Sequence, residues 1–175
     1  KGLSRSERTQ RELLFGANLI DIKGKSIQRL LVEENIARMR EMARYSCSVK
    51  LISRDSTSVV DSDILVPGDI INLSDPIMST FPCDVLLLVG DAIVNESMLT
   101  GESVPISKSP VKSEDLMKWR QTGEVTSEIA KSMLYAGTKV VRIRGPAQTS
   151  AKTPALGYVV RTGFNTTKGA LVRSM

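Results

Sequence analysis

The chain has 175 residues, enough for one domain with a buried core, and its 41% hydrophobic and 25% charged residues are typical of a globular protein. It contains no histidine, which excludes Ser-His-Asp and Cys-His catalysis and histidine-ligated zinc. Residues 55–110 carry 1 basic and 9 acidic side chains between two basic segments, and with only 4% aromatic residues this pattern argues against nucleic-acid binding.

The N-terminal quarter of the sequence favours helical structure after an irregular start. Lys1–Gln10 is polar and is expected to be irregular or frayed, and Arg11–Ile22 is expected to form a short element with a turn at Gly16. Ser26 is suited to N-cap a helix that runs towards Tyr45. Within it, apolar residues recur at helical spacing at Val32, Ile36, Met39 and Ala43. No segment reaches the roughly 18 apolar residues of a membrane span, so we expect a soluble piece.

From residue 48 onward the pattern becomes that of short strands separated by turns. Expected strands are Ser48–Ile52, Ser58–Val60, Ile64–Val66, Ile70–Ile71, Val85–Val89, Ala92–Val94, Met133–Arg144 and Ala155–Thr162. Pro67-Gly68 marks a turn, and Gly90-Asp91 marks a break of hairpin type. Strands of this length with turn signals about every 8–12 residues predict an all-β sandwich or distorted barrel.

The remaining segments differ from this β pattern. Residues 108–128 lose apolar spacing and are expected to form a long, exposed insertion, partly without order. Lys168–Met175 reads as the start of a final helix. Cys47 and Cys83 show no paired-cysteine motif, so we expect two buried thiols and no disulfide.

One carboxylate stands out in the segment Val94–Pro105. Apolar residues flank a turn of small residues, Thr100-Gly101-Glu102-Ser103. Gly101 leaves room for a close backbone approach, and Pro105 stiffens the exit. The segment therefore predicts an exposed Glu102 that a rigid scaffold delivers to a partner surface, where it orients or deprotonates a water.

Two other interpretations of this segment stay open on the residues alone. The four residues also suit a hairpin turn with solvated ends. Glu96 lies six positions before Glu102, which admits the two-carboxylate arrangement of a glycosidase.

The order and spacing of further motifs carry a family resemblance. These are Leu65-Val66-Pro67-Gly68-Asp69-Ile70, Pro82-Cys83-Asp84, Gly90, the segment Val94–Pro105 with Lys108, Gly137-Thr138-Lys139-Val140 and Val160–Gly169. In this order they resemble the actuator domain of P-type ATPases over residues 36–108 and 133–175. Pro82-Cys83-Asp84, Asn95-Glu96-Ser97-Met98 and Arg161–Gly169 are most similar to the type V-B branch of endolysosomal and vacuolar polyamine exporters.

The resemblance implies a fold and a domain plan. The expected fold is mainly β with N- and C-terminal helices, a distorted jelly-roll or double-stranded β-helix. We expect an N-terminal segment over 1–47, a β-rich core over 48–167 containing the insertion 108–128, and the start of a C-terminal helix over 168–175. In this family two membrane spans separate the segments that resemble Lys25–Glu34 and Asn35–Tyr45. Their absence predicts an engineered junction near residues 34–35.

The resemblance also implies a role for the loop. Glu102 would activate the water that hydrolyses an aspartyl-phosphate on another domain, Gly101 would let the backbone approach the phosphate, and Thr100 and Ser103 would shape the loop. Asp84 and Asn95 are expected to brace the loop, and Asp69 to cap backbone amides. The chain itself is expected to bind no cofactor or metal, whereas the full-length pump would use ATP and Mg²⁺.

Partners and location follow from the same resemblance. The partners would be the phosphorylation and nucleotide-binding domains of the same pump, at the cytosolic face of an endolysosomal or vacuolar membrane. The basic residues Arg5, Arg8 and Arg11 suit a solvated face or a contact with anionic lipid. A type V-A pump acting on membrane helices, and a stand-alone β-sandwich that binds lipid or protein, are the alternatives.

Overall fold

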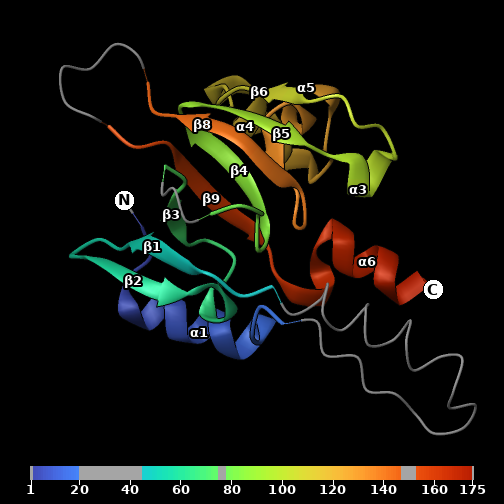
Figure 1. The fold of residues 1–175 in the computed structure, drawn as a ribbon. Coiled ribbons are helices and arrows are strands. Elements are labelled where there is room, and N and C mark those ends of the chain that lie inside the picture. The colour runs from blue at the N-terminus through green and yellow to red at the C-terminus, as the bar shows by residue number, and fades with distance from the viewer. Residues whose placement is uncertain (1, 20–44, 75–77, 147–152, 175) are drawn as a thin grey trace, which may run out of the picture.

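Two antiparallel sheets form the centre of the molecule in the computed structural model, which describes residues 2–19, 45–74, 78–146 and 153–174 (Figure 1). The larger sheet has six strands in the order β2-β1-β3-β9-β4-β7, and the smaller has three in the order β6-β5-β8. Their bounds are β1 Ser48–Ile52, β2 Thr57–Asp61, β3 Ile70–Asn72, β4 Asp84–Val89, β5 Asp91–Asn95, β6 Ile106–Lys108, β7 Met133–Leu134, β8 Lys139–Arg144 and β9 Leu156–Arg161.

The main core lies between the two sheets. Alternate residues of β1, Val49 and Leu51, point into it, as the period of two predicts. Ala92 and Val94 enter from β5 of the smaller sheet, and Phe81 and Leu65 fill the space at its margin. A second apolar cluster on the other face of the larger sheet contains Leu86, Ile129 and Met133. The apolar run of β4 is continuous because this strand is covered on both faces.

Helices occupy both ends of the chain, as expected, but the N-terminal one begins earlier than predicted. α1 spans Arg5–Phe15, so the expectation of irregular structure is wrong for Arg5–Gln10. The Ser4 amide donates to the Glu7 carboxylate at 2.8 Å in a capping box, which satisfies an amide that the helix start would otherwise leave unpaired. α1 ends at Gly16 with φ 69, where a turn was expected. At the other end α6 spans Thr167–Ser174.

The segment 108–128 is helical over much of its length rather than irregular. α4 spans Ser113–Thr122 and α5 spans Ser127–Ala130. Most of their side chains are exposed, as expected of an insertion, but Trp119 of α4 and Ile129 of α5 belong to the second apolar cluster. Lys108 is the last residue of β6 and is buried, so the insertion begins after it.

Two expected connections in the β region have a different form. Residues Ser62–Ile64 form a short 3-10 helix, η1, and Ile64–Val66 contributes no strand. β4 and β5 do not pair across Gly90; each joins a different sheet. Gly90 has φ 95, and a Cβ there would lie 2.3 Å from the Arg144 carbonyl oxygen, so the chain passes between sheets where only glycine fits.

Several expectations concern thiols, membrane spans and the N-terminal helix. Both described cysteines are free thiols; Cys83 is buried as expected, whereas Cys47 is only half-buried. Among the described helices, none combines the length and the apolar character that a bilayer crossing requires. The predicted helix from Ser26 towards Tyr45 and the junction at 34–35 fall outside the described residues.

Candidate functional site

The Thr100–Ser103 loop stands at the end of a β-hairpin. β5 and β6 pair antiparallel, with Ala92 opposite Lys108 and Val94 opposite Ile106. Between them the chain forms a single helical turn, α3 (Ser97–Thr100), where the sequence suggested only a tight turn. The Asn95 carboxamide accepts a hydrogen bond from the Ser97 amide at 2.9 Å, so Asn95 braces this turn as expected.

The loop's conformation depends on two of its own residues. Gly101 ends α3 with φ 77, in the left-handed region that glycine adopts most readily. The Thr100 hydroxyl donates to the Glu96 carbonyl at 3.2 Å and accepts from the Glu102 amide at 3.2 Å. The Thr100 side chain therefore links the start of α3 to the backbone of Glu102.

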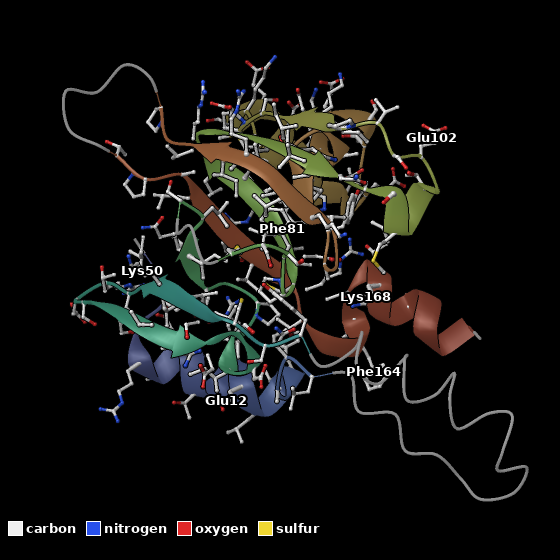
Figure 2. All side chains as sticks on the ribbon, viewed as in Figure 1. Glu12, Lys50, Phe81, Glu102, Phe164 and Lys168 are labelled. Atoms are coloured by element: carbon white, nitrogen blue, oxygen red, sulfur yellow. The ribbon has the colours of Figure 1, made fainter. Side chains whose placement is uncertain are left out.

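Glu102 projects from the molecule at the tip of this hairpin (Figure 2). The side chains of Glu102 and Ser103 are exposed. The space around Gly101 is open, since a Cβ added there would have no neighbouring atom within 4 Å. An incoming surface can thus reach both the carboxylate and the loop backbone. Thr100, Gly101, Glu102 and Ser103 are brought together as consecutive residues of one exposed turn.

A buried ion pair holds the base of this loop. Glu96 and Lys108 lie on the two arms of the hairpin, 2.7 Å apart, with side chains only 7% and 5% exposed. The Lys108 ammonium also donates to the Ala130 carbonyl at 3.1 Å and lies 5.4 Å from the centre of the Tyr135 ring. The exposed tip therefore rests on a base that is buried and tied to α5 and the segment after β7.

This pairing removes Glu96 as a partner for Glu102. A glycosidase pair needs two carboxylates that face one substrate, whereas Glu96 is buried against Lys108 and Glu102 is exposed. Within the described ranges, no three His, Cys, Asp or Glu side chains come together as a metal site. The site is a single carboxylate on a braced hairpin.

The family comparison agrees with this geometry. A family model described as the P-type ATPase actuator domain matches residues 44–175, which is most of the chain and includes the whole hairpin. The chain belongs to the P-type ATPase actuator domain family. The expected family and its mainly β fold with terminal helices are therefore confirmed.

The relatives of this actuator domain are cation-transporting pumps. It is 43% identical over 166 residues to the vacuolar cation-transporting ATPase YPK9 of Saccharomyces cerevisiae, covering 93% of this chain and 11% of that protein. It is 40% identical over 117 residues to the probable cation-transporting ATPase 13A5 of Mus musculus, covering 66% of this chain and 9% of that protein. The probable cation-transporting ATPase 13A4 of Gallus gallus is 29% identical over 222 residues, covering 99% of the chain and 18% of that protein.

These relatives are far longer than the actuator domain described here. The chain spans 11% and 9% of the first two, so the other domains of a pump of this kind lie outside it. The family match favours a pump domain over the stand-alone binding module that the sequence left open.

Asp84 serves a different part of the actuator domain from the one expected. Its carboxylate accepts from the Ala136 amide at 2.9 Å and from the Thr167 amide at 2.9 Å, and it pairs with Arg161 at 3.1 Å. Burial raises the pKa of Asp84, and the two backbone donors oppose that rise. Asp84 therefore holds the first residue of α6 against the larger sheet and does not brace the Glu102 loop.

Asp69 has the capping role that the sequence predicted, and an additional partner. It accepts from the Val66 amide at 3.0 Å and forms an ion pair with Arg8 of α1 at 3.2 Å. Arg11 donates to the Pro67 carbonyl at 2.7 Å. Two of the three N-terminal arginines thus attach α1 to the core, which corrects the expectation of a solvated basic face.

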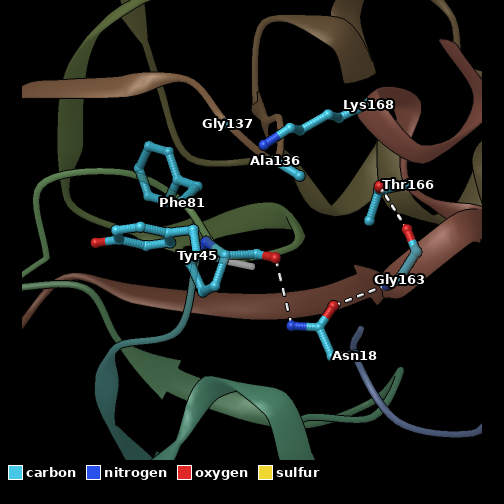
Figure 3. Close-up of a pocket in the computed structure, with 9 residues that line it drawn as sticks. Asn18, Tyr45, Phe81, Ala136, Gly137, Gly163, Thr166 and Lys168 are labelled. Atoms are coloured by element: carbon cyan, nitrogen blue, oxygen red, sulfur yellow. Dashed lines mark hydrogen bonds between the residues drawn. The ribbon is translucent and has the colours of Figure 1, made fainter. Parts of the chain in front are cut away.

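Asn18 links the segment after α1 to three other parts of the domain, namely η1, the residues before β4 and the residues after β9 (Figure 3). Its amide nitrogen donates to the carbonyls of Ser62 at 2.9 Å and Pro82 at 3.3 Å, and its oxygen accepts from the Gly163 amide at 2.8 Å. The adjoining cavity, which Lys168 also lines, has a volume of about 20 Å³, room for one water. The hydrogen bonds of Asn18 therefore connect segments that are far apart in the sequence.

Proposed function

We propose that this actuator domain hydrolyses an aspartyl-phosphate carried by another domain of the same pump, with Glu102 as the group that activates water. The observation that supports this proposal is the exposed Glu102 on a hairpin whose base is buried and ion-paired. Phosphoryl transfer depends mainly on positioning and electrostatic stabilisation, and a rigid base with an open tip suits that requirement.

Each loop residue has a part in this step. The Glu102 carboxylate accepts a proton from the attacking water, whose oxygen forms the new bond to phosphorus as the bond to the aspartyl oxygen breaks. Gly101 has no side chain, so the loop backbone can approach the phosphoryl oxygens. Thr100 fixes the backbone at Glu102, and the exposed Ser103 hydroxyl can donate to the phosphoryl group.

The experiment is a single-turnover measurement in the full-length pump. Glu102→Gln keeps the size of the side chain and removes its basicity, so dephosphorylation is expected to slow by about 100-fold or more while phosphorylation continues. The phosphoenzyme then accumulates. Glu12→Gln is a matched control, because Glu12 is exposed on α1 at the other end of the molecule (Figure 2). Equal dephosphorylation rates in the two variants would rule out the proposed role.

We further propose that the pump moves polyamines across an endolysosomal or vacuolar membrane, with this domain on the cytosolic face. The type V-B motifs Pro82-Cys83-Asp84 and Asn95-Glu96-Ser97-Met98 support the cargo, and the similarity to the vacuolar pump YPK9 supports the membrane. ATP and Mg²⁺ would bind in other domains. Stimulation of ATPase activity by spermine is the test; its absence would favour the type V-A alternative.

A further inference from the structure

An open groove lies on the outer face of the larger sheet, away from the Glu102 loop. β4 and β9 form its floor, and α1 and α4, which lie on opposite sides of these strands in Figure 1, form its walls. Its volume is about 710 Å³. Its lining includes Arg11, Leu88, Leu116, Trp119, Arg120 and Tyr158.

The floor of this groove is apolar, and the two helices leave it partly uncovered. Leu88, Trp119 and Tyr158 are only half-buried at the margin of the second apolar cluster, and Leu116 is 36% exposed. An apolar face of a sheet is stabilised when another element packs against it, and a helix is one such element. Aromatic side chains and arginine are also the types enriched in protein interfaces.

Each wall of the groove carries one arginine. Arg11 comes from α1 and Arg120 from the last turn of α4. Arg11 donates to the Pro67 carbonyl, and its charge also attracts the nearby carboxylates of Glu7 and Asp69. Arg120 is exposed and, among the described residues, forms no ion pair. Charge complementarity therefore calls for an occupant with an apolar centre and carboxylates on the flank that faces Arg120.

We infer that the groove binds an acidic amphipathic helix that belongs to the same pump polypeptide and lies outside these 175 residues. A stable complex between separate proteins needs about 800 Å² from each partner, and a groove lined by eight residues offers less than this. A helix in the same polypeptide needs less contact area, because its tether raises the effective concentration to about the millimolar range. The chain spans only 11% of YPK9, so a pump of that length has ample chain to supply the helix.

The first test uses the 175-residue chain and its single tryptophan, Trp119, as the reporter. Two synthetic helices of about 16 residues share one apolar face, and glutamate flanks it in one and lysine in the other. The glutamate helix is expected to give a saturable blue shift of Trp119 emission that weakens with salt. The lysine helix is expected to bind at least about fivefold more weakly. Equal binding of the two helices, or no shift with either, overturns the inference.

Two variants and lipid vesicles test whether binding in the groove causes the blue shift of Trp119 emission. Arg120→Glu is expected to weaken binding of the glutamate helix at least about fivefold, whereas Arg142→Glu, on the exposed face of β8, is the matched charge control and should leave it unchanged. Circular dichroism establishes that both variants fold. A shift with phosphatidylserine vesicles in the absence of peptide would identify a lipid site and refute the inference.

The second test identifies the occupant in the full-length pump. A photo-crosslinking amino acid in place of Leu116 is expected to label an acid-flanked segment of the same polypeptide, which mass spectrometry then locates. Labelling of lipid alone, of a separate protein alone, or of nothing contradicts the inference. The proposed role of Glu102 is unaffected by either result, because its test measures dephosphorylation.

Discussion

The buried Glu96–Lys108 ion pair holds the base of the Glu102 loop, so its removal is expected to change both the stability of the domain and the position of the loop. Lys108→Met removes the ammonium and keeps much of the side-chain volume, which leaves the Glu96 carboxylate buried without its counter-charge. Removing one partner of a buried ion pair typically costs about 3–5 kcal/mol. This is a large share of the roughly 5–15 kcal/mol by which a domain is stable.

The double variant Glu96→Gln/Lys108→Met removes both charges and separates the ion pair from the surrounding packing. It is expected to lose only about 1–2 kcal/mol, because no uncompensated charge remains in the interior. The two single losses, Lys108→Met and Glu96→Gln, should therefore sum to several kcal/mol more than the loss in the double variant, a clear departure from additivity. Urea unfolding at 25 °C, followed by Trp119 fluorescence, measures all four proteins.

The same pair has a kinetic consequence in the full-length pump. Glu96 also accepts, through its carbonyl, the hydrogen bonds of Leu99, Thr100 and the Thr100 hydroxyl. A shift of its backbone would move Glu102, and a misplacement of about 1 Å can cost roughly 100-fold in rate. A folded Glu96→Gln/Lys108→Met pump should thus dephosphorylate slowly despite an intact Glu102. A loss below about 1 kcal/mol in Lys108→Met, or strictly additive losses, would refute this account of the loop.

Two further predictions concern the core. Gly157→Ala places a Cβ 2.3 Å from Val85 Cγ1, between β9 and β4. Because the site is then overpacked, the free energy of unfolding measured by urea titration should fall by about 1–3 kcal/mol. An unchanged urea midpoint would contradict the packing described. Burial raises the pKa of Cys83 above its ordinary 9.0, so the neutral thiol favours the folded state and this contribution is lost as the pH rises above 9. Between pH 8 and pH 10 the free energy of unfolding should therefore fall less in Cys83→Ala than in the unmodified protein. Equal slopes of this free energy against pH in the two proteins would argue against a buried thiol.

Local signals in the sequence were sufficient for many elements and insufficient for two helices. The strands Ser48–Ile52 and Asp84–Val89 follow from alternation and from a continuous apolar run. The sequence does not predict α1 because the surface of this helix is polar, although Ser4 and Glu7 have capping-box spacing. The same holds for α4, despite acidic residues in its first turn and Gly123 at its end.

In the candidate site, too, some features can be predicted from neighbouring residues and others cannot. Consecutive residues define the Thr100–Ser103 loop, so its exposure and its glycine turn could be predicted from the sequence. The pairing of Glu96 with Lys108 could not, because it depends on the register between β5 and β6. The role of Asp84 cannot be predicted from neighbouring residues either, because its partner Thr167 lies 83 positions away.

The sequence by itself determined the family, the kind of fold and the loop that carries Glu102, because these depend on neighbouring residues and on the order of short motifs. Only the tertiary structure decided that β4 and β5 enter different sheets, that Arg8 and Asp84 attach the terminal helices, and that a groove lies between α1 and α4. Such contacts form where many distant residues together bury apolar surface and satisfy buried charges. Because these contacts join residues that are far apart in the sequence, no short segment of the sequence is sufficient to predict them.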